Sequence, residues 1–214
     1  MQRAYWGRAI AGVAAAAGWA GLALQLAILV RGLGFAAGLW RYLGYFTILT
    51  NLGAALVATS WVLGRGDLLS SSRSRLTAAT CILIVGLVYS IALRGLWSPS
   101  GWQRVSDVLL HDTTPLLWFV LWIAAAPAGL EWRDIKWAIL PAPIYAAYSL
   151  ARGAFNGWYP YWFLDPARQS AIELLMSIVL LLCAFALVAA FLIGLSRFRP
   201  LRPHPSAASP ATSQ

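Results

Sequence analysis

The chain has 214 residues, of which 60% are hydrophobic and 11% are charged, and its mean hydropathy is +0.69. These values exclude an ordinary soluble domain and are typical of integral membrane proteins. The net charge of +9 comes from loops between apolar runs and from a basic tail. Such a charge suits anionic lipid headgroups, and nothing in its pattern indicates nucleic-acid binding. We therefore expect membrane lipids as partners.

The first apolar run covers residues 9–30 and contains no charged residue. A helix of this length crosses a hydrocarbon core of about 30 Å, and the run is too long for the core of a signal peptide. It is therefore expected to stay in the protein as the first membrane span. Further apolar runs cover residues 45–63, 76–93, 108–126, 137–155 and 172–195.

These six runs predict an all-α fold, a polytopic bundle of six transmembrane helices within residues 1–196. Helices are expected because a membrane span must satisfy its backbone polar groups internally. The run at 137–155 is the weakest, because Pro141, Pro143 and Arg152 interrupt it. Residues 197–214 are basic and rich in Pro and Ser, which predicts a disordered tail.

The distribution of basic residues predicts the orientation of the bundle. If the N-terminus is cytoplasmic, ten of the 16 Lys and Arg residues fall on the cytoplasmic side and six on the other side. This excess follows the positive-inside rule and places both termini in the cytoplasm. With this topology, polar residues of all six spans gather in the outer half of the membrane.

The second and fourth spans carry the polar residues of greatest interest. In "YFTILTN" (residues 45–51), Thr47, Thr50 and Asn51 have the spacing that places them on one helix face. In "LLHDTTP" (residues 109–115), His111 lies at a similar depth, while the adjacent Asp112 points elsewhere. Polar groups within a span usually face the bundle interior, so we expect a pocket between these two spans, open to the outer leaflet.

Each of these residues also has a structural interpretation. Thr47 and Thr50 could bond to carbonyl groups of their own helix, and Asn51 could join two helices. His111, the only histidine outside the tail, is equally compatible with a functional role and with a structural hydrogen bond. Glu173, at the start of the sixth span, could be simply solvated, but it is the carboxylate that we would test as a partner of His111.

A hydroxyl beside an imidazole is the smallest nucleophile–base pair for acyl transfer. Asn51 or a backbone N–H at a helix start could donate to the developing oxyanion. The sequence contains no Gly-x-Ser-x-Gly elbow, no His-Glu-x-x-His and no cluster with metal spacing. We therefore predict no metal and no cofactor.

Three stretches, "WRYLGYFTILTN", "LLHDTTP" and "NGWYPYWFLDP", occur in this order. Together they resemble the FAR-17a/androgen-induced-gene-1-like superfamily, and most closely its bacterial branch, the Pr6Pr family membrane proteins. The resemblance covers most of residues 40–166. It implies a multi-pass protein of the bacterial cytoplasmic membrane.

Animal members of this superfamily are membrane hydrolases that cleave fatty acid esters of hydroxy fatty acids with a threonine and a histidine. The resemblance matches the threonine best to Thr47, with Thr50 as second choice, and the histidine to His111. The family's Trp-Tyr-Pro segment matches residues 158–160, including Tyr159. The sequence departs from the animal pattern at Asp112 and in the short spacing from His111 to Pro115.

The leading hypothesis is a hydrolase of hydrophobic lipid esters in which Thr47 is the nucleophile and His111 the general base. Supporting or binding roles are expected for Thr50, Asn51, Asp112, Tyr159 and Glu173. The alternative is a non-catalytic membrane protein that uses the same cavity, either a small-molecule or proton-coupled transporter or a lipid-binding protein. In that case His111 would be a titrating relay. The sequence indicates neither an oligomeric state nor a particular acyl chain.

Overall fold

The computed structural model describes residues 2–197, and helices account for 83% of the structure, with no strand in this range. The prediction of an all-α fold is confirmed for this part of the chain. The predicted tail lies outside the described residues from position 198 onward. The α-helices are α1 (Gln2–Leu33), α2 (Phe35–Tyr42), α3 (Phe46–Val62), α4 (Ser72–Val88), α5 (Gly101–Val108), α6 (Thr114–Ala125), α7 (Ile135–Ile139), α8 (Pro141–Asn156) and α9 (Ala171–Arg197).

Short helical segments of other types connect them. Two are π-helical, η2 (Tyr89–Leu93) at the end of α4 and η4 (Leu109–Thr113) between α5 and α6. The 3₁₀ segments are η1 (Leu68–Ser70), η3 (Arg94–Leu96), η5 (Trp132–Asp134) and η6 (Trp162–Leu164).

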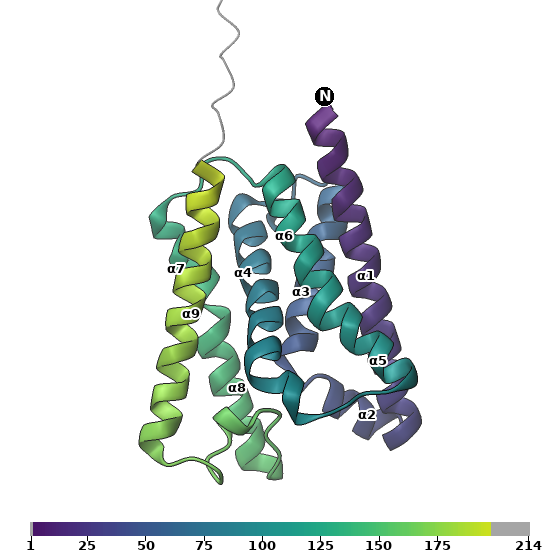
Figure 1. Ribbon diagram of the computed structural model, residues 1–214, viewed down its shortest axis with the longest axis vertical. Coiled ribbons are helices and arrows are strands. Elements are labelled where there is room, and N and C mark those ends of the chain that lie inside the picture. Colours follow the sequence, from purple (N-terminus) through teal and green to yellow (C-terminus); the bar gives the residue numbers. More distant parts are fainter. Residues whose placement is uncertain (1, 198–214) are drawn as a thin grey trace, which may run out of the picture.

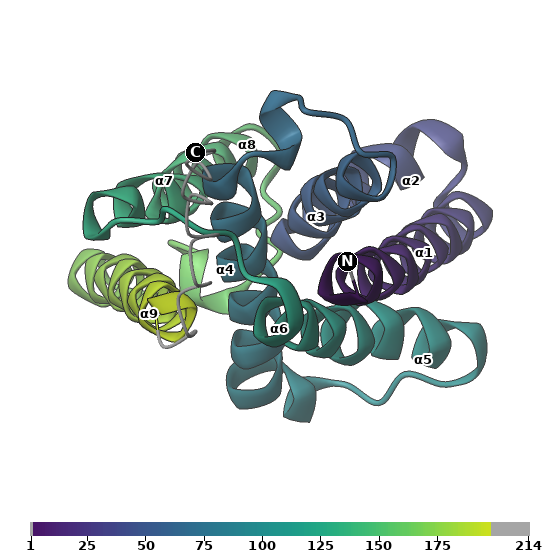
Figure 2. The same cartoon turned by 90° about the horizontal axis from the view of Figure 1, so that it is seen from above.

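The long helices run side by side as one bundle, in which α3 packs on α1 and α4, and α9 packs on α4, α7 and α8 (Figures 1 and 2). The start of α1 and the end of α9 lie at the same end of the bundle, the upper end in Figure 1. Helices α2 and α5 lie toward the opposite end.

Four helical stretches are long and apolar enough to cross a membrane: Tyr5–Leu33, Ser72–Leu96, Gly101–Ala125 and Ala171–Arg197. A fifth is formed if α2 and α3, which are bent by 80° relative to each other, count as one span. The predicted run at 137–155 becomes α7 and α8, of 5 and 16 residues, which lie beside α9. Each of them is shorter than the about 20 residues that a helix needs to cross the hydrocarbon core. The structure thus shows a multi-span apolar bundle with four or five such spans.

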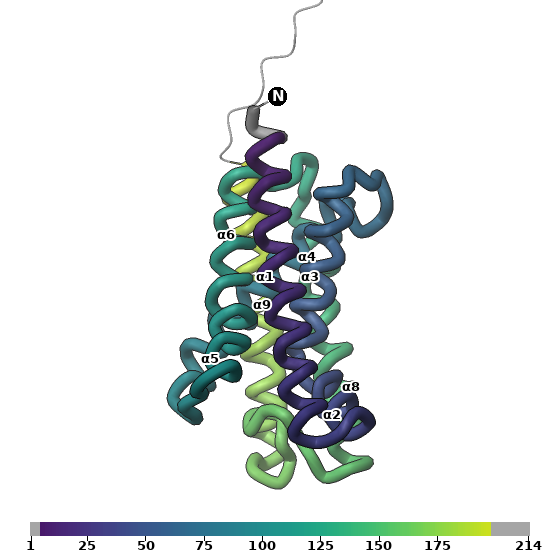
Figure 3. The backbone as a smooth tube through the Cα atoms, turned by 90° about the vertical axis from the view of Figure 1, so that its right-hand side faces the viewer, coloured from purple at the N-terminus to yellow at the C-terminus, as the bar shows by residue number. Residues whose placement is uncertain are grey.

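The bend between α1 and α2 depends on glycine. Gly34 has a φ of +79°, a region that other residues rarely adopt, and it precedes the first residue of α2. A Cβ atom at Gly38 would lie 2.8 Å from the carbonyl oxygen of Leu29, so α2 can approach α1 this closely only without a side chain there. Figure 3 shows α2 beside the end of α1. The chain then turns into the bundle and begins α3.

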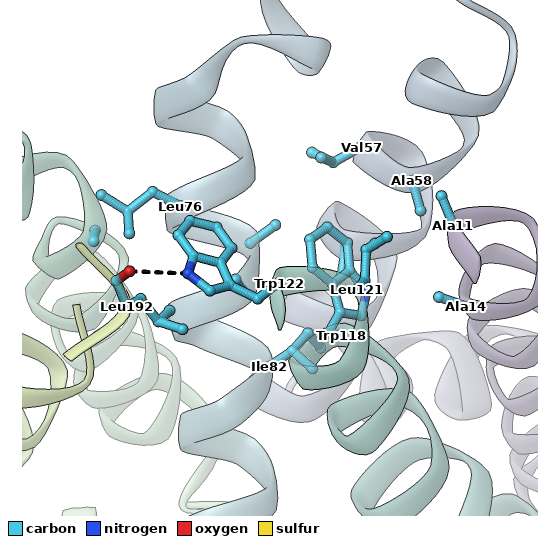
Figure 4. Packing of buried hydrophobic residues seen from close by; sticks show 14 of the residues in the cluster. Ala11, Ala14, Val57, Ala58, Leu76, Ile82, Trp118, Leu121, Trp122 and Leu192 are labelled. Carbon is cyan, nitrogen blue, oxygen red and sulfur yellow. Dashed lines mark hydrogen bonds between the residues drawn. The ribbon is translucent and has the colours of Figure 1, made fainter. Parts of the chain in front are cut away.

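The largest buried cluster joins six helices, α1, α3, α4, α6, α7 and α9 (Figure 4), and its α1 residues lie in the first half of that helix. Small residues such as Ala11, Ala14 and Ala58 allow α1 and α3 to pack closely, as is common between membrane helices. Trp122 of α6 donates a hydrogen bond of 2.9 Å from its indole N–H to the carbonyl oxygen of Leu192 in α9. This apolar cluster joins the helices on either side, and Thr47, Asn51 and Asp107 are buried outside it.

Candidate active site

Thr47 lies in the first turn of α3, where backbone N–H groups have no partner within the helix. The residue is 8% exposed, and its hydroxyl oxygen lies 3.2 Å from Nε2 of His111. The sequence predicted this pairing, and the structure brings the two side chains into direct contact.

His111 lies in the π-helical segment η4 rather than in a regular helix. Pro115 has no N–H, so it cannot donate the usual hydrogen bond to the carbonyl oxygen of His111 four residues earlier. One turn earlier, the backbone N–H of Thr114 bonds to the carbonyl oxygen of Leu109, five residues before it, and the Thr114 hydroxyl donates to the same oxygen at 2.8 Å. Single π turns inside longer helices are often found at functional sites because they change the direction in which a side chain points.

Asp107 completes the arrangement from the helical turn before His111. Its carboxylate oxygen Oδ1 lies 3.1 Å from Nδ1 of His111, and its main-chain carbonyl oxygen lies 3.1 Å from the same nitrogen. Asp107 is only 5% exposed. A threonine hydroxyl, an imidazole and a buried carboxylate therefore follow one another in a chain of close contacts.

Both groups near Nδ1 are acceptors, so this nitrogen carries a proton in the neutral imidazole. Nε2 then has a free lone pair that can accept the proton of Thr47. This is the tautomer that a general base needs.

Tyr89 holds the carboxylate and the imidazole from the other π segment, η2. Its hydroxyl donates a hydrogen bond of 2.5 Å to Oδ2 of Asp107. Its ring stacks on the imidazole of His111 with 3.9 Å between ring centroids. One side chain thus fixes the orientation of both groups.

Tyr161 approaches Thr47 from the loop before α9. The Thr47 N–H donates to the Tyr161 hydroxyl oxygen at 3.4 Å, and the two hydroxyl oxygens are 3.5 Å apart. Burial raises the pKa of Tyr161, which keeps the phenol protonated. Its proton is thus available as a donor to an oxygen bound next to Thr47.

Sequence reasoning chose the right loop for this tyrosine but the wrong residue. The ring of Tyr159 packs against Gly153, where an added Cβ would lie 2.0 Å from Cε1 of the ring, so Tyr159 fills space between the loop and α8. Tyr161, two residues later, is the tyrosine that reaches Thr47. Tyr159 and Tyr161 lie two residues apart in the loop, and the sequence does not indicate which of the two rings points toward Thr47.

The predicted carboxylates are also in other places. Glu173 accepts hydrogen bonds from the backbone N–H and hydroxyl of Ser170 at the exposed start of α9. Asp112 forms an ion pair with Arg94 and points away from the imidazole, as the sequence predicted. The i, i+4 spacing of Asp107 and His111 was the signal in the sequence that could have identified the actual partner.

Thr50 and Asn51 are buried beside Thr47, and the donor groups of their side chains bond to backbone carbonyl oxygens. The Thr50 hydroxyl donates to the carbonyl oxygen of Phe46 at 2.8 Å. Asn51 donates from Nδ2 to the carbonyl oxygens of Thr47 and Leu110, at 2.8 and 3.3 Å, and so joins α3 to η4. The Thr50 hydroxyl is therefore bonded to its own helix and does not face a base, as a nucleophile would. Asn51 links two helices.

The pocket beside Thr47 lies on a different side from the one expected. Between α3 and η4 the side chains are in contact, and the cavity opens instead among α3, α4, η2, α8 and α9. It has a volume of about 50 Å³, and Thr47, Tyr89 and Tyr161 lie on its otherwise largely apolar wall. The hydroxyl of the candidate nucleophile thus belongs to a residue that lines an apolar pocket.

Within residues 2–197, no group of three or more His, Cys, Asp or Glu side chains is arranged to hold a metal ion. The chain matches no family model, and neither a curated protein nor a solved structure shows significant similarity to it. The structural case for a function therefore rests on the contacts among Thr47, His111, Asp107 and Tyr161.

Proposed function

We propose that the protein is a six-span membrane hydrolase of lipid esters, with Thr47 as nucleophile and His111 as general base. The observation that carries this proposal is the 3.2 Å contact between the Thr47 hydroxyl and a His111 imidazole whose other nitrogen faces Asp107. The resemblance to the FAR-17a/androgen-induced-gene-1-like superfamily supports it, because the same threonine and histidine are the ones matched.

The reaction follows from these contacts. Oγ1 of Thr47 attacks the ester carbonyl carbon while Nε2 of His111 takes the hydroxyl proton. Asp107 stabilises the resulting imidazolium, and the Tyr161 hydroxyl donates to the oxyanion. The carbon–oxygen bond to the leaving alcohol then breaks, and the alcohol takes the proton from Nε2.

Water completes the cycle. It attacks the acyl-threonine and gives a proton to Nε2, and the second tetrahedral intermediate collapses to release the carboxylic acid. Thr47 regains its proton from the imidazolium. Each cycle thus consumes one ester and one water and leaves the protein unchanged.

The location proposed for this chemistry is the outer half of a bacterial cytoplasmic membrane. With α7 and α8 as one interrupted span, the bundle has six spans, and the positive-inside pattern places both termini in the cytoplasm. Helix α1 begins and α9 ends at one end of the bundle, and α3 begins toward the other end next to α2. In the proposed orientation, Thr47 is therefore nearer the outer surface. A hydrophobic ester dissolved in the outer leaflet can then approach from the side.

The test is hydrolysis of long-chain and branched fatty-acid esters by the purified protein in nanodiscs. Thr47→Ala and His111→Ala should each abolish turnover above background. Thr50→Ala is the matched control, because it removes a neighbouring hydroxyl of the same helix face that bonds to the carbonyl of Phe46. If turnover survives Thr47→Ala and is lost in Thr50→Ala, the assignment of the nucleophile is wrong. If the folded wild-type protein hydrolyses no ester, the proposed activity is wrong.

A further inference from the structure

A second cavity, much larger than the pocket beside Thr47, runs along the bundle. It is a groove of about 1010 Å³ lined by residues of α3, α4, α7, α8 and the η1 turn. On α3 its lining extends from Phe46 to Val57, which is about 16 Å along the helix axis. Exposed Leu68, Leu140 and Ile144 contribute to its lining.

The groove is closed at the end where α3 begins. There, Tyr145 of α8 donates a hydrogen bond of 2.8 Å to the carbonyl oxygen of Gly44, and Tyr148 donates one of 3.1 Å to that of Leu43. These two bonds hold the start of α3 against α8. Farther along, the groove separates the two helices.

Several polar residues that line the groove bond to the protein itself. The Thr50 hydroxyl is bonded to the carbonyl oxygen of Phe46, and the Ser74 hydroxyl donates to that of Leu68 at 2.7 Å. Arg73, the one charged lining residue, pairs with Asp134 at 2.8 Å. The groove therefore suits an uncharged apolar chain and offers little to a polar solute.

The groove and the pocket beside Thr47 share two lining residues, Phe46 and Tyr145. Their rings are packed with 4.9 Å between centroids and thus form a partition between the two cavities. A pocket of about 50 Å³ has room for a few water molecules but not for a fatty acyl chain. An ester bound at Thr47 must therefore place its chain elsewhere, and the groove is the adjoining space.

We propose that the groove binds the fatty acyl chain of the ester, which enters when the packed rings of Phe46 and Tyr145 move apart and then lies along α3 toward Leu68. This inference rests on the proposed function for the position of the ester carbonyl, whereas binding of an acyl chain in the groove can be tested without turnover. The groove proposal predicts that the protein prefers esters with long unbranched acyl chains over short ones, because only a long chain fills the groove.

Gly53 provides the variant that tests the groove. It lines the groove, and a Cβ atom added there would meet nothing within 4 Å, so Gly53→Phe adds a ring to the cavity without a clash at the backbone. Gly194 of α9 is the matched control, because it is also a helical glycine with open space at Cβ and does not line the groove. Both variants should fold, which circular dichroism and size-exclusion chromatography will check.

The first measurement is photolabelling of the full-length protein in nanodiscs with a palmitic acid analogue that carries a diazirine in its chain. We expect labelled peptides from α3, α4 and α8, with labelling reduced about tenfold in Gly53→Phe and unchanged in Gly194→Phe and Thr47→Ala. Labelling spread over the lipid-facing helices, and equal in the two glycine variants, would overturn the proposal.

The second measurement compares hydrolysis of palmitoyl and butyryl esters. Gly53→Phe should lower kcat/KM for the palmitoyl ester about tenfold more than for the butyryl ester. If Thr47→Ala abolishes turnover while Gly53→Phe leaves the chain-length preference unchanged, the groove proposal fails and the hydrolase proposal stands. If the groove is labelled but no ester is hydrolysed, the hydrolase proposal fails and binding of an acyl chain in the groove stands.

Discussion

At the scale of single residues, the site depends on groups that hold one another in one orientation. His111 contacts Thr47 through Nε2 and Asp107 through Nδ1, and Tyr89 both stacks on its ring and bonds to the carboxylate. A buried carboxylate of this kind is costly unless charged or polar groups stabilise it, and its position beside an imidazole is what the proposed function requires.

Asp107→Asn tests whether this carboxylate supports the imidazole. An amide at this position can donate to Nδ1, which favours the tautomer with the proton on Nε2 and removes the base needed by Thr47. We expect kcat to fall by about 10³ to 10⁴-fold with KM changed little. Asp112→Asn, which alters the neighbouring carboxylate paired with Arg94, is the control and should leave kcat near the wild-type value. Equal losses in both variants would remove Asp107 from the mechanism.

At the scale of elements, two π-helical segments and one loop bring the site together. Tyr89 and His111 both lie in π segments, and Tyr161 lies in the loop between α8 and α9. The loop is held by Tyr159, whose ring occupies the space that Gly153 leaves open on α8.

These elements also show how far the sequence could be interpreted. Hydrophobic length predicted the long helices. The spacing within "YFTILTN" and "LLHDTTP" predicted a shared pocket, and the family resemblance singled out Thr47 and His111 as the reacting pair. The π segments could not be predicted in this way, because they depend on how Pro115 and the neighbouring helices redistribute backbone hydrogen bonds. Tyr161 was missed because its contact with Thr47 spans 114 residues and is set by loop packing.

Gly153→Ala tests the coupling between the loop and the site. The new methyl group would meet the Tyr159 ring at 2.0 Å, so the loop must move and carry Tyr161 away from Thr47. We expect a lower thermal unfolding temperature and a loss of ester turnover of at least about tenfold. Gly32→Ala, a helical glycine with open space at Cβ, should have neither effect. A wild-type turnover rate in a destabilised Gly153→Ala would show that the loop position does not matter for catalysis.

At the scale of the whole molecule, the candidate site lies apart from the largest apolar cluster. The large apolar cluster of Figure 4 lies toward the end where α1 begins, and the hydrogen-bonded residues around Thr47 lie toward the other end. If both termini are cytoplasmic, the loops before α5 and before α4 must emerge on opposite sides of the membrane.

Single-cysteine labelling tests this topology. In a Cys183→Ala background, Ser98→Cys in the exposed loop before α5 should react with a membrane-impermeant maleimide in intact bacterial spheroplasts. Gly66→Cys, in the exposed loop before α4, should react only after the membrane is permeabilised. Cys81 is buried and should remain unlabelled in both. Labelling of Gly66→Cys from outside would reverse the orientation proposed here.

The 80° bend between α2 and α3 also has an electrostatic consequence. Because α2 turns aside, the 17-residue α3 starts as a new helix at Phe46. Its N-terminus therefore lies beside the candidate site. The aligned peptide dipoles of a helix give its N-terminus about half a positive elementary charge. Thr47 stands in the first turn, so this partial charge lies where an oxyanion would form. Unlike a lysine or a histidine, it carries no proton to lose, and its contribution to stabilising that oxyanion is the same at every pH at which the fold persists.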